Sequence, residues 1–272
     1  MIGLYIGGGA LSLALVFFIV YLVLIAPVRN KRIDEFKSVL YAHRGLHGNG
    51  RAENSMSAFL AAVEAGYGIE LDIRLSSDGE LVVFHDDTLN RVAGVDGRVD
   101  AYTAEQLGQM RLNGTDDGVP TFRDVLAAID GRVPLLVEIK EDQGSYKVSD
   151  AAAEMLKDYN GKYIVESFNP LSLGNFAKKL PEVPRGILSQ NYQKDEKYRA
   201  LKYRLLGALL LNRVCKPCFI AYDHRDSKRL SLRIVRRLFG AATLAWTVRS
   251  PEEERAARDK GFDSVIFENY LA

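Results

Sequence analysis

The sequence predicts an α/β protein, a (β/α)8 barrel of the TIM type that is preceded by an apolar N-terminal helix. Short β-branched and aromatic runs alternate with helical patterns along most of the chain, which is typical of βαβ units and a largely parallel sheet. The chain has 272 residues, close to the roughly 250 residues that one such barrel uses. Polar side chains suited to catalysis follow several strand-like runs, where a barrel carries its active site.

The first segment, residues 1–28, contains no charged side chain. An apolar run of more than roughly 18 residues is long enough to span a bilayer as a helix. No basic residue precedes the run and Arg29 follows it, which argues against a cleaved signal peptide. The sequence thus predicts a transmembrane anchor over residues 1–28, a basic linker over 29–37 and a barrel domain over 38–272. The positive-inside rule then predicts a single-pass protein of the cell membrane with a cytoplasmic catalytic domain.

The barrel region contains more strand-like runs than a closed eight-stranded barrel needs. They are Val39–Arg44, Ile69–Arg74, Leu81–His85, Leu135–Lys140, Tyr163–Phe168, Arg185–Ser189, Phe219–Asp223, Thr243–Val248 and Ser264–Phe267. The link between the second and third runs contains the turn signal Ser77-Asp78-Gly79 and is short for a helical crossover. One of these two runs is therefore expected to be a hairpin partner.

Helical patterns occupy the connections between the other strands. They are predicted at Ser55–Ala65, Thr121–Ile129, Val148–Tyr159, Leu171–Leu180, Lys228–Phe239 and Pro251–Lys260. Asn54 and Ser250 are expected as N-caps, and Gly66 and Gly261 as C-terminal stops. The amphipathic segment Tyr198–Arg213 is predicted to be a helix that either packs on the barrel or lies in a membrane interface.

Charge and cysteine content exclude some functions. The formal net charge is +1, which argues against a nucleic-acid partner. Residues 194–237 hold thirteen Lys and Arg against four Asp and Glu, so this segment either meets anionic lipid or forms ordinary solvated helix faces. Cys215 and Cys218 have no second ligand pair for zinc and are interpreted as structural.

Side chains that can carry chemistry gather at the carboxyl ends of the first four predicted strands. They are His43, Arg44, Glu70, Asp72, His85, Glu138 and Lys140. Because side chains two apart on a strand point to the same face, the second strand presents two carboxylates together and the fourth presents a carboxylate beside a lysine. These side chains are therefore expected to meet at one mouth of the barrel.

Their types favour metal-assisted cleavage of a phosphodiester. Three converging carboxylates repel one another unless a hard cation binds among them, so we expect Mg²⁺ or Ca²⁺. Two histidines suit general acid and base catalysis near neutral pH. The arginine and the lysine supply the positive charge that a phosphate needs. The alternative is that these groups form buried ion pairs that hold strand ends together.

The motifs resemble those of the glycerophosphodiester phosphodiesterase family over about Val39 to Asn269. They are His43-Arg44-Gly45, Glu53-Asn54-Ser55, Glu70-Leu71-Asp72, Asp78-Gly79, Val83-Phe84-His85-Asp86, Glu138-Ile139-Lys140, Ser167-Phe168 and Trp246-Thr247-Val248. The resemblance implies a (β/α)8 barrel that hydrolyses glycerophosphodiesters to sn-glycerol 3-phosphate and an alcohol. It leaves open whether water attacks directly or the glycerol hydroxyl first forms a cyclic phosphate.

The resemblance also implies roles for individual residues. The three carboxylates resemble the family's metal ligands, the two histidines its acid–base pair, and Arg44 and Lys140 its phosphate contacts. Glu53, Asn54 and Trp246 are expected around them, with Glu53 either ligating the metal or orienting its neighbours.

The sequence also departs from the family pattern. It ends its last strand with Phe267-Glu268-Asn269 where the family often has Thr-Asp. The additional segment Lys194–Cys218 resembles that of membrane-anchored members, which makes a lysophospholipid substrate an expectation.

Two other functions are consistent with the sequence. One is a phosphatidylinositol phospholipase C or sphingomyelinase D type of lipid phosphodiesterase, which would release a different phosphate product. The other is a catalytically silent membrane scaffold, which predicts the loss of catalytic side chains.

Overall fold

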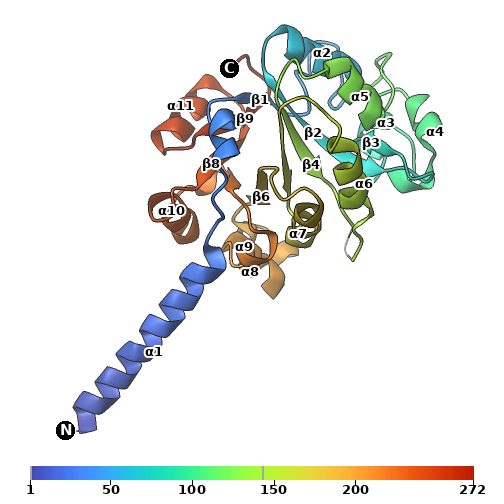
Figure 1. The fold of residues 1–272 in the computed structure, drawn as a ribbon. Helices are drawn as coiled ribbons and strands as arrows, with labels where there is room; N and C mark the ends of the chain where they lie inside the picture. Colours follow the sequence, from blue (N-terminus) through green and yellow to red (C-terminus); the bar gives the residue numbers. More distant parts are fainter. Residues whose placement is uncertain (1, 143) are drawn as a thin grey trace.

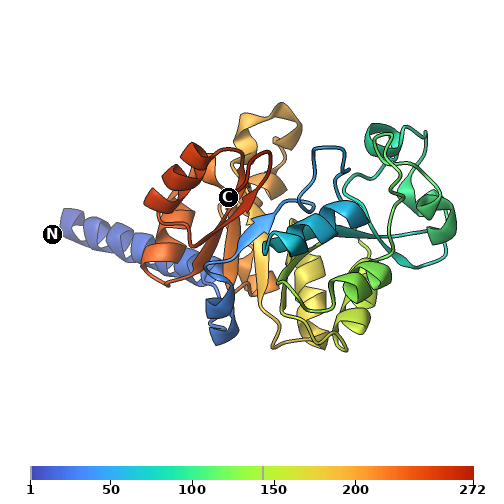
Figure 2. The same cartoon turned by 90° about the horizontal axis from the view of Figure 1, so that it is seen from above.

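The strands close a barrel in the computed structural model, which describes residues 2–142 and 144–272, with side chains described from residue 11 onward. Eight of them run parallel (Figures 1 and 2): β1 (Leu40–Ala42), β2 (Gly68–Leu75), β4 (Leu135–Ile139), β5 (Tyr163–Ser167), β6 (Arg185–Ser189), β7 (Phe219–Asp223), β8 (Ala242–Val248) and β9 (Ser264–Phe267). β1 pairs with both β2 and β9, so the sheet closes on itself. This architecture confirms the predicted (β/α)8 barrel.

The ninth strand is the expected hairpin partner. β3 (Leu81–Val83) pairs antiparallel with β2, with Val83 opposite Ile73. Gly79 in the connecting turn has a φ of +83°, which favours glycine. The chain then forms a small lobe with α3 (Asn90–Ala93), a 3₁₀ turn η2 (Val99–Ala101) and α4 (Ala104–Gly108), elements that the sequence did not predict. The lobe has its own apolar core, which includes Phe84 and Leu107.

Helices cover the outside of the barrel. They are α2 (Met56–Glu64), α5 (Phe122–Ile129), α6 (Lys147–Leu156), α7 (Pro170–Lys179), α10 (Leu230–Arg237) and α11 (Pro251–Asp259). Ser250 caps α11 as predicted, since its hydroxyl accepts from the backbone N–H of Glu253. The predicted cap of α2 was wrong by one residue, because the Ser55 hydroxyl accepts from the Ala58 N–H. Asn54 is thereby free to turn toward the barrel.

The predicted helix at Tyr198–Arg213 is two short helices. The connection from β6 to β7 contains 3₁₀ turns η3 (Tyr192–Lys194) and η4 (Glu196–Tyr198), then α8 (Leu201–Gly207) and α9 (Asn212–Cys215). The chain breaks between the helices where Leu209 takes a φ of +60°. α8 and α9 lie near α7 (Figure 1). Both cysteine thiols are free and buried, in line with the structural interpretation.

The barrel interior is divided between an apolar and a polar end. Apolar side chains such as Tyr41, Leu136 and Phe219 form a buried cluster inside the sheet. Gly186 belongs to this packing, since a Cβ there would lie 2.0 Å from the Phe219 ring. The charged residues lie further along the same strands, so the carboxyl ends of the strands carry the polar groups.

The N-terminal segment forms helix α1 (Ile2–Ile25), which projects away from the barrel (Figures 1 and 2). It joins the domain where the Asn212 amide donates to the Ile25 carbonyl at 2.8 Å. Among the residues that the structure describes, no helix is both long and apolar enough to cross a bilayer. Met1 and the side chains of residues 2–10 lie outside that description, and the described side chains of α1 begin at residue 11. A span needs about 20 apolar residues, so this finding overturns the predicted anchor and the single-pass location in the cell membrane.

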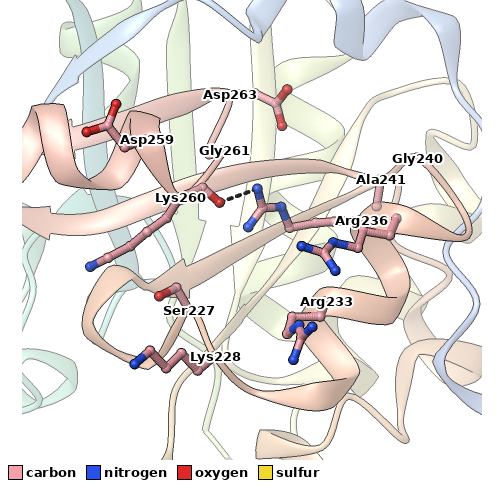
Figure 3. A pocket seen from close by; sticks show the side chains of 11 residues that line it. Ser227, Lys228, Arg233, Arg236, Gly240, Ala241, Asp259, Lys260, Gly261 and Asp263 are labelled. Carbon is pink, nitrogen blue, oxygen red and sulfur yellow. Dashed lines mark hydrogen bonds between the residues drawn. The ribbon is translucent and has the colours of Figure 1, made fainter.

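Basic residues of segment 194–237 line two separate pockets. Lys202 on α8 lines a groove beside the carboxyl ends of the strands. Arg233 and Arg236 on α10 line a separate pocket of about 710 Å³ with Lys260 (Figure 3). That pocket lies along α10 and the end of α11, and residues just before β8 and β9 also border it. The contact of this segment with anionic lipid stays a prediction.

Candidate active site

Three carboxylates lie together at the carboxyl end of the barrel, as predicted. Glu70 and Asp72 come from β2 and Glu138 from β4, and the register pairs Asp72 with Glu138. One carboxylate oxygen from each of the three residues lies within 4.8 Å of the other two. All three side chains are buried.

The electrostatics of this cluster match a site for a cation. Burial raises the pKa of Glu70 well above its ordinary value, and the nearby Asp72 and Glu138 charges raise it further. Burial also raises the pKa of Glu138 to about 7, against the opposing effect of Lys140. Burial alone would raise the pKa of Asp72, but the positive charges of Lys140 and Arg44 hold it well below its usual range.

A hard divalent cation fits these ligands. Mg²⁺ and Ca²⁺ prefer carboxylate oxygens as ligands. A positive ion between two carboxyl groups with raised pKa values favours their ionised form. The Asp72 Oδ1 atom is buried without a hydrogen bond of acceptable geometry, although Lys140 Nζ lies 3.1 Å away. This orphaned acceptor is available to a metal.

Metal affinity should therefore depend on pH. Because the raised pKa of Glu138 keeps it protonated below about pH 7, a cation must displace that proton. We expect the apparent affinity for Mg²⁺ or Ca²⁺ to fall about tenfold from pH 8 to pH 6, one proton being displaced over one pH unit below the pKa. The measurement is the metal-induced rise in Tm, titrated at each pH against chelated protein. Equal affinities at the two pH values would contradict this ligand assignment.

Each predicted catalytic histidine contacts a carboxylate, which in turn contacts an arginine. The His43 Nδ1 atom lies 2.5 Å from Glu268 Oε2, and Arg249 Nε lies 2.7 Å from the other oxygen of Glu268. Burial alone would raise the pKa of Glu268, but the hydrogen bond from His43 and the charge of Arg249 hold it below its ordinary value. The ionised carboxylate can only accept, so the His43 Nδ1 atom carries the proton and donates.

The second histidine repeats this arrangement. His85 Nδ1 lies 2.6 Å from Asp86 Oδ1, and Arg91 donates to the other Asp86 oxygen at 2.6 Å. Hydrogen bonds from Arg91 and His85 outweigh burial and hold the pKa of Asp86 at about 2, so this carboxylate also accepts. Arg91 further donates to Glu53, which ties the small lobe to the barrel mouth.

Both imidazoles are therefore neutral at neutral pH, with the Nε2 lone pair free. Burial lowers the pKa of His85 to about 4, and the charges of Lys140 and Arg44 oppose its protonation as well. Burial also lowers the pKa of His43, in spite of Glu268. The His43 Nε2 atom points toward the carboxylate cluster, 3.9 Å from Glu70. A neutral imidazole with a free Nε2 can accept a proton.

The predicted phosphate contacts border the same cluster. Arg44 has a φ of +55° and its backbone N–H donates to Glu70 at 2.9 Å. Its guanidinium donates to Glu53 at 2.7 Å, while its buried Nε has no hydrogen-bond partner in the described residues. Lys140 Nζ lies 2.8 Å from Glu138. The unpartnered Arg44 donor suits a phosphate oxygen.

Two further predicted residues support these groups. The Asn54 amide donates to Asp72 Oδ2 at 2.8 Å, which orients that carboxylate. Trp246 packs edge-on against Phe168 with ring centroids 5.5 Å apart, and its buried indole N–H is without a partner in the part of the chain that is described. Lys140 Nζ lies 6.0 Å from the centre of the same Phe168 ring. Glu53, by contrast, is engaged by arginines and stands outside the three-carboxylate cluster.

The sequence reasoning did not assign Glu268, Arg249, Arg91 or Glu166 to the site. Glu268 was noted as a departure at the barrel mouth, but nothing in the sequence signals that it meets a histidine 225 residues away. Glu166 follows the alternation of β5 and could have been found from it. Burial raises the pKa of Glu166 well above its ordinary value, and the negative charge of Glu138 adds to this effect.

The fold and the site together define a barrel enzyme suited to metal-assisted hydrolysis of a phosphodiester. The sequence model of the Glycerophosphoryl diester phosphodiesterase family matches residues 43–271. The chain therefore belongs to the glycerophosphoryl diester phosphodiesterase family.

Several known proteins are similar to this chain. A probable glycerophosphodiester phosphodiesterase 2 of Mycobacterium tuberculosis is 35% identical over 248 residues, which cover 84% of this chain and 86% of that protein. A glycerophosphodiester phosphodiesterase of Caldanaerobacter subterraneus is 33% identical over 165 residues, or 57% of this chain and 68% of its own length. A human lysophospholipase D is 28% identical over 150 residues, covering 50% of this chain and 46% of its own.

A solved structure shares the fold. The phosphodiesterase of Oleispira antarctica in complex with the product sn-glycerol-3-phosphate superposes with a TM-score of 0.72 at 23% identity, covering 86% of this chain and 94% of that one.

Proposed function

We propose that this protein hydrolyses glycerophosphodiesters to sn-glycerol 3-phosphate and an alcohol with the help of one bound divalent cation. The observation that carries the proposal is the cluster of Glu70, Asp72 and Glu138, flanked by two histidine–carboxylate pairs. Family membership and the product-bound Oleispira structure, which concerns a relative of the same fold, support it.

Different side chains have different roles in hydrolysis at phosphorus. Arg44 and Lys140 bind and orient the phosphate, since their positive ends border the carboxylate cluster. One histidine removes a proton from the attacking oxygen through Nε2. The other acts as the general acid in its protonated form, so it takes up a proton at Nε2 from solvent before it delivers that proton to the leaving alkoxide. The carboxylates at the two Nδ1 atoms fix the ring orientations and favour the imidazolium form that each proton transfer requires.

The three carboxylates would hold the cation. When bound, a divalent ion supplies Lewis-acid polarisation of a phosphoryl oxygen and lowers the pKa of an oxygen nucleophile. The residues themselves exclude bulk water from the cluster, because all three carboxylates are buried.

Glu268 is assigned as the positioning residue of His43, and its charge is testable. We expect Glu268→Gln to lower kcat about 10- to 100-fold with little change in KM, because the amide keeps the shape but no longer stabilises the imidazolium. We also expect the acidic limb of the pH–rate profile to move to lower pH, since His43 then protonates less readily. Glu252→Gln, an exposed residue of α11, is the matched control and should leave both quantities unchanged. A variant whose KM alone changes would assign Glu268 to substrate binding instead.

The function is tested by following product release. Purified protein with Mg²⁺ or Ca²⁺ should convert glycerophosphocholine or glycerophosphoethanolamine to sn-glycerol 3-phosphate, and a chelator should stop the reaction. A phospholipase C or sphingomyelinase D type of activity would release a different phosphate product. A silent scaffold would release none, although every side chain that the proposed chemistry uses is present.

A further inference from the structure

An apolar groove of about 620 Å³ lies beside the metal cluster and takes no part in the chemistry described so far. Its walls come from residues after β5 and β6 and from α8 and α9, which places it on the same end of the barrel as the active site. Its volume is that of a small-molecule site. The groove is lined mainly by apolar and aromatic side chains, which include Phe168, Leu171, Tyr192, Tyr203, Leu206 and Val214.

The groove borders the site at Phe168, which is one of its lining residues. The Phe168 ring lies 6.0 Å from the Nζ atom of Lys140, the predicted phosphate contact. Tyr192, another lining residue, follows β6 at the same end of the barrel. A substrate whose phosphate lies at Lys140 can therefore extend an arm along the groove.

The groove walls expose apolar surface. Leu171 on α7 is 50% exposed and Val214 on α9 is 44% exposed. Tyr192, Tyr198 and Tyr203 pack together with centroids 4.7 to 5.4 Å apart and form a rigid aromatic wall. Removing such surface from water is favourable by roughly 25 cal/mol per Å².

Charge decides between a hydrocarbon chain and a quaternary ammonium as the occupant. Aromatic rings can hold an ammonium, but Lys197 and Lys202 already place their Nζ atoms 4.8 and 5.0 Å from the rings of Tyr198 and Tyr203. Among the described lining residues the one carboxylate, Glu141, accepts from the Val148 and Ser149 N–H groups at the start of α6. The groove therefore repels a cation and accepts an apolar chain.

We propose that this groove binds the single hydrocarbon chain of a lysophospholipid, a glycerophosphodiester that bears one acyl or alkyl chain. The inference rests on the proposed function. Water adds to phosphorus, the bond from phosphorus to the head-group oxygen breaks, and that oxygen takes the proton. The products are the chain-bearing glycerol phosphate and the free head-group alcohol.

The test compares substrates of different chain length in the wild type and in two variants, one altered in the groove and one altered outside it. The substrates are glycerophosphocholine and lysophosphatidylcholines with 6-, 8- and 10-carbon chains, at concentrations where they are monomeric. For the wild type we expect KM to fall about tenfold for every two carbons added, since each buried methylene favours binding by about 0.8 kcal/mol. Leu206→Asp on the groove wall should abolish this dependence and leave glycerophosphocholine turnover within about twofold. Leu201→Asp on the same helix, at a residue that is 68% exposed and not part of the groove lining, should keep the dependence.

The outcomes separate the two proposals. Turnover of glycerophosphocholine without any effect of chain length would overturn the groove assignment and leave the proposed function standing. Stronger use of choline substrates by Leu206→Asp, again without a chain effect, would instead mark the groove as an ammonium site. If no substrate is hydrolysed, the proposed function fails. In that case the groove assignment is tested by itself, by calorimetric measurement of the binding of the same lipids to wild type and to Leu206→Asp, both treated with chelator. Equal affinities for all chain lengths would overturn the groove assignment.

Discussion

Replacing His85 with alanine should lower kcat about 10²- to 10⁴-fold, and His43→Ala should do the same. Each imidazole is held by a carboxylate at Nδ1, so Nε2 is the atom through which it can accept and then release a proton. Loss of a general acid or base typically has an effect of this size. The measurement is steady-state kinetics on glycerophosphocholine with saturating cation.

Two further measurements isolate the chemical role of the histidines. The metal-induced rise in Tm should persist in both variants, because neither histidine belongs to the three-carboxylate cluster. His224→Gln changes a buried histidine outside the site and should leave kcat within about twofold. If either alanine variant turned over at the wild-type rate, the proton-transfer assignment would be wrong.

The second large effect concerns the metal ligands. Asp72→Asn should lower kcat by roughly 10³-fold or more, because a bound cation supplies several kcal/mol of transition-state stabilisation. The substitution also removes the charge that faces Lys140 and Arg44. The Tm of the variant should no longer respond to Mg²⁺ or Ca²⁺.

The control for this variant is another buried carboxyl. Glu166 lies on β5 opposite Glu138 in the strand register, and burial raises its pKa well above its ordinary value. Glu166→Gln replaces this carboxyl, which lies outside the three-carboxylate cluster, by an amide of the same shape and should preserve both activity and the response to metal. A metal response retained by Asp72→Asn but lost in Glu166→Gln would move the cation to the neighbouring strand.

Much of the barrel was predictable because its signals are local. The alternation of apolar runs with helical patterns located the strands within a few residues, and the short Ser77-Asp78-Gly79 link marked the hairpin that leaves eight parallel strands. An error arose where two neighbouring residues could each serve as the cap of a helix. Ser55 rather than Asn54 caps α2, since Asn54 makes a longer-range hydrogen bond to Asp72.

For the N-terminal helix and the basic segment, the interpretation went further than the local sequence pattern can establish. Hydropathy predicted an anchor, and charge counts left open either a lipid-facing surface or ordinary solvated helix faces. The described helices contain no membrane span, and basic residues of segment 194–237 line two separate pockets. Composition cannot tell how a folded chain distributes its charges in space.

The sequence by itself determined the barrel and the place of three carboxylates, two histidines, Arg44 and Lys140 at one mouth, because side-chain alternation along parallel strands sends these residues there. Only the tertiary structure decided which carboxylates hold the histidines and which helices build the apolar groove. Glu268 meets His43 through closure of the sheet, and α8 comes to line the same groove as Phe168 through folding of a long connection. Such contacts join residues distant in sequence, and no local period or spacing encodes them.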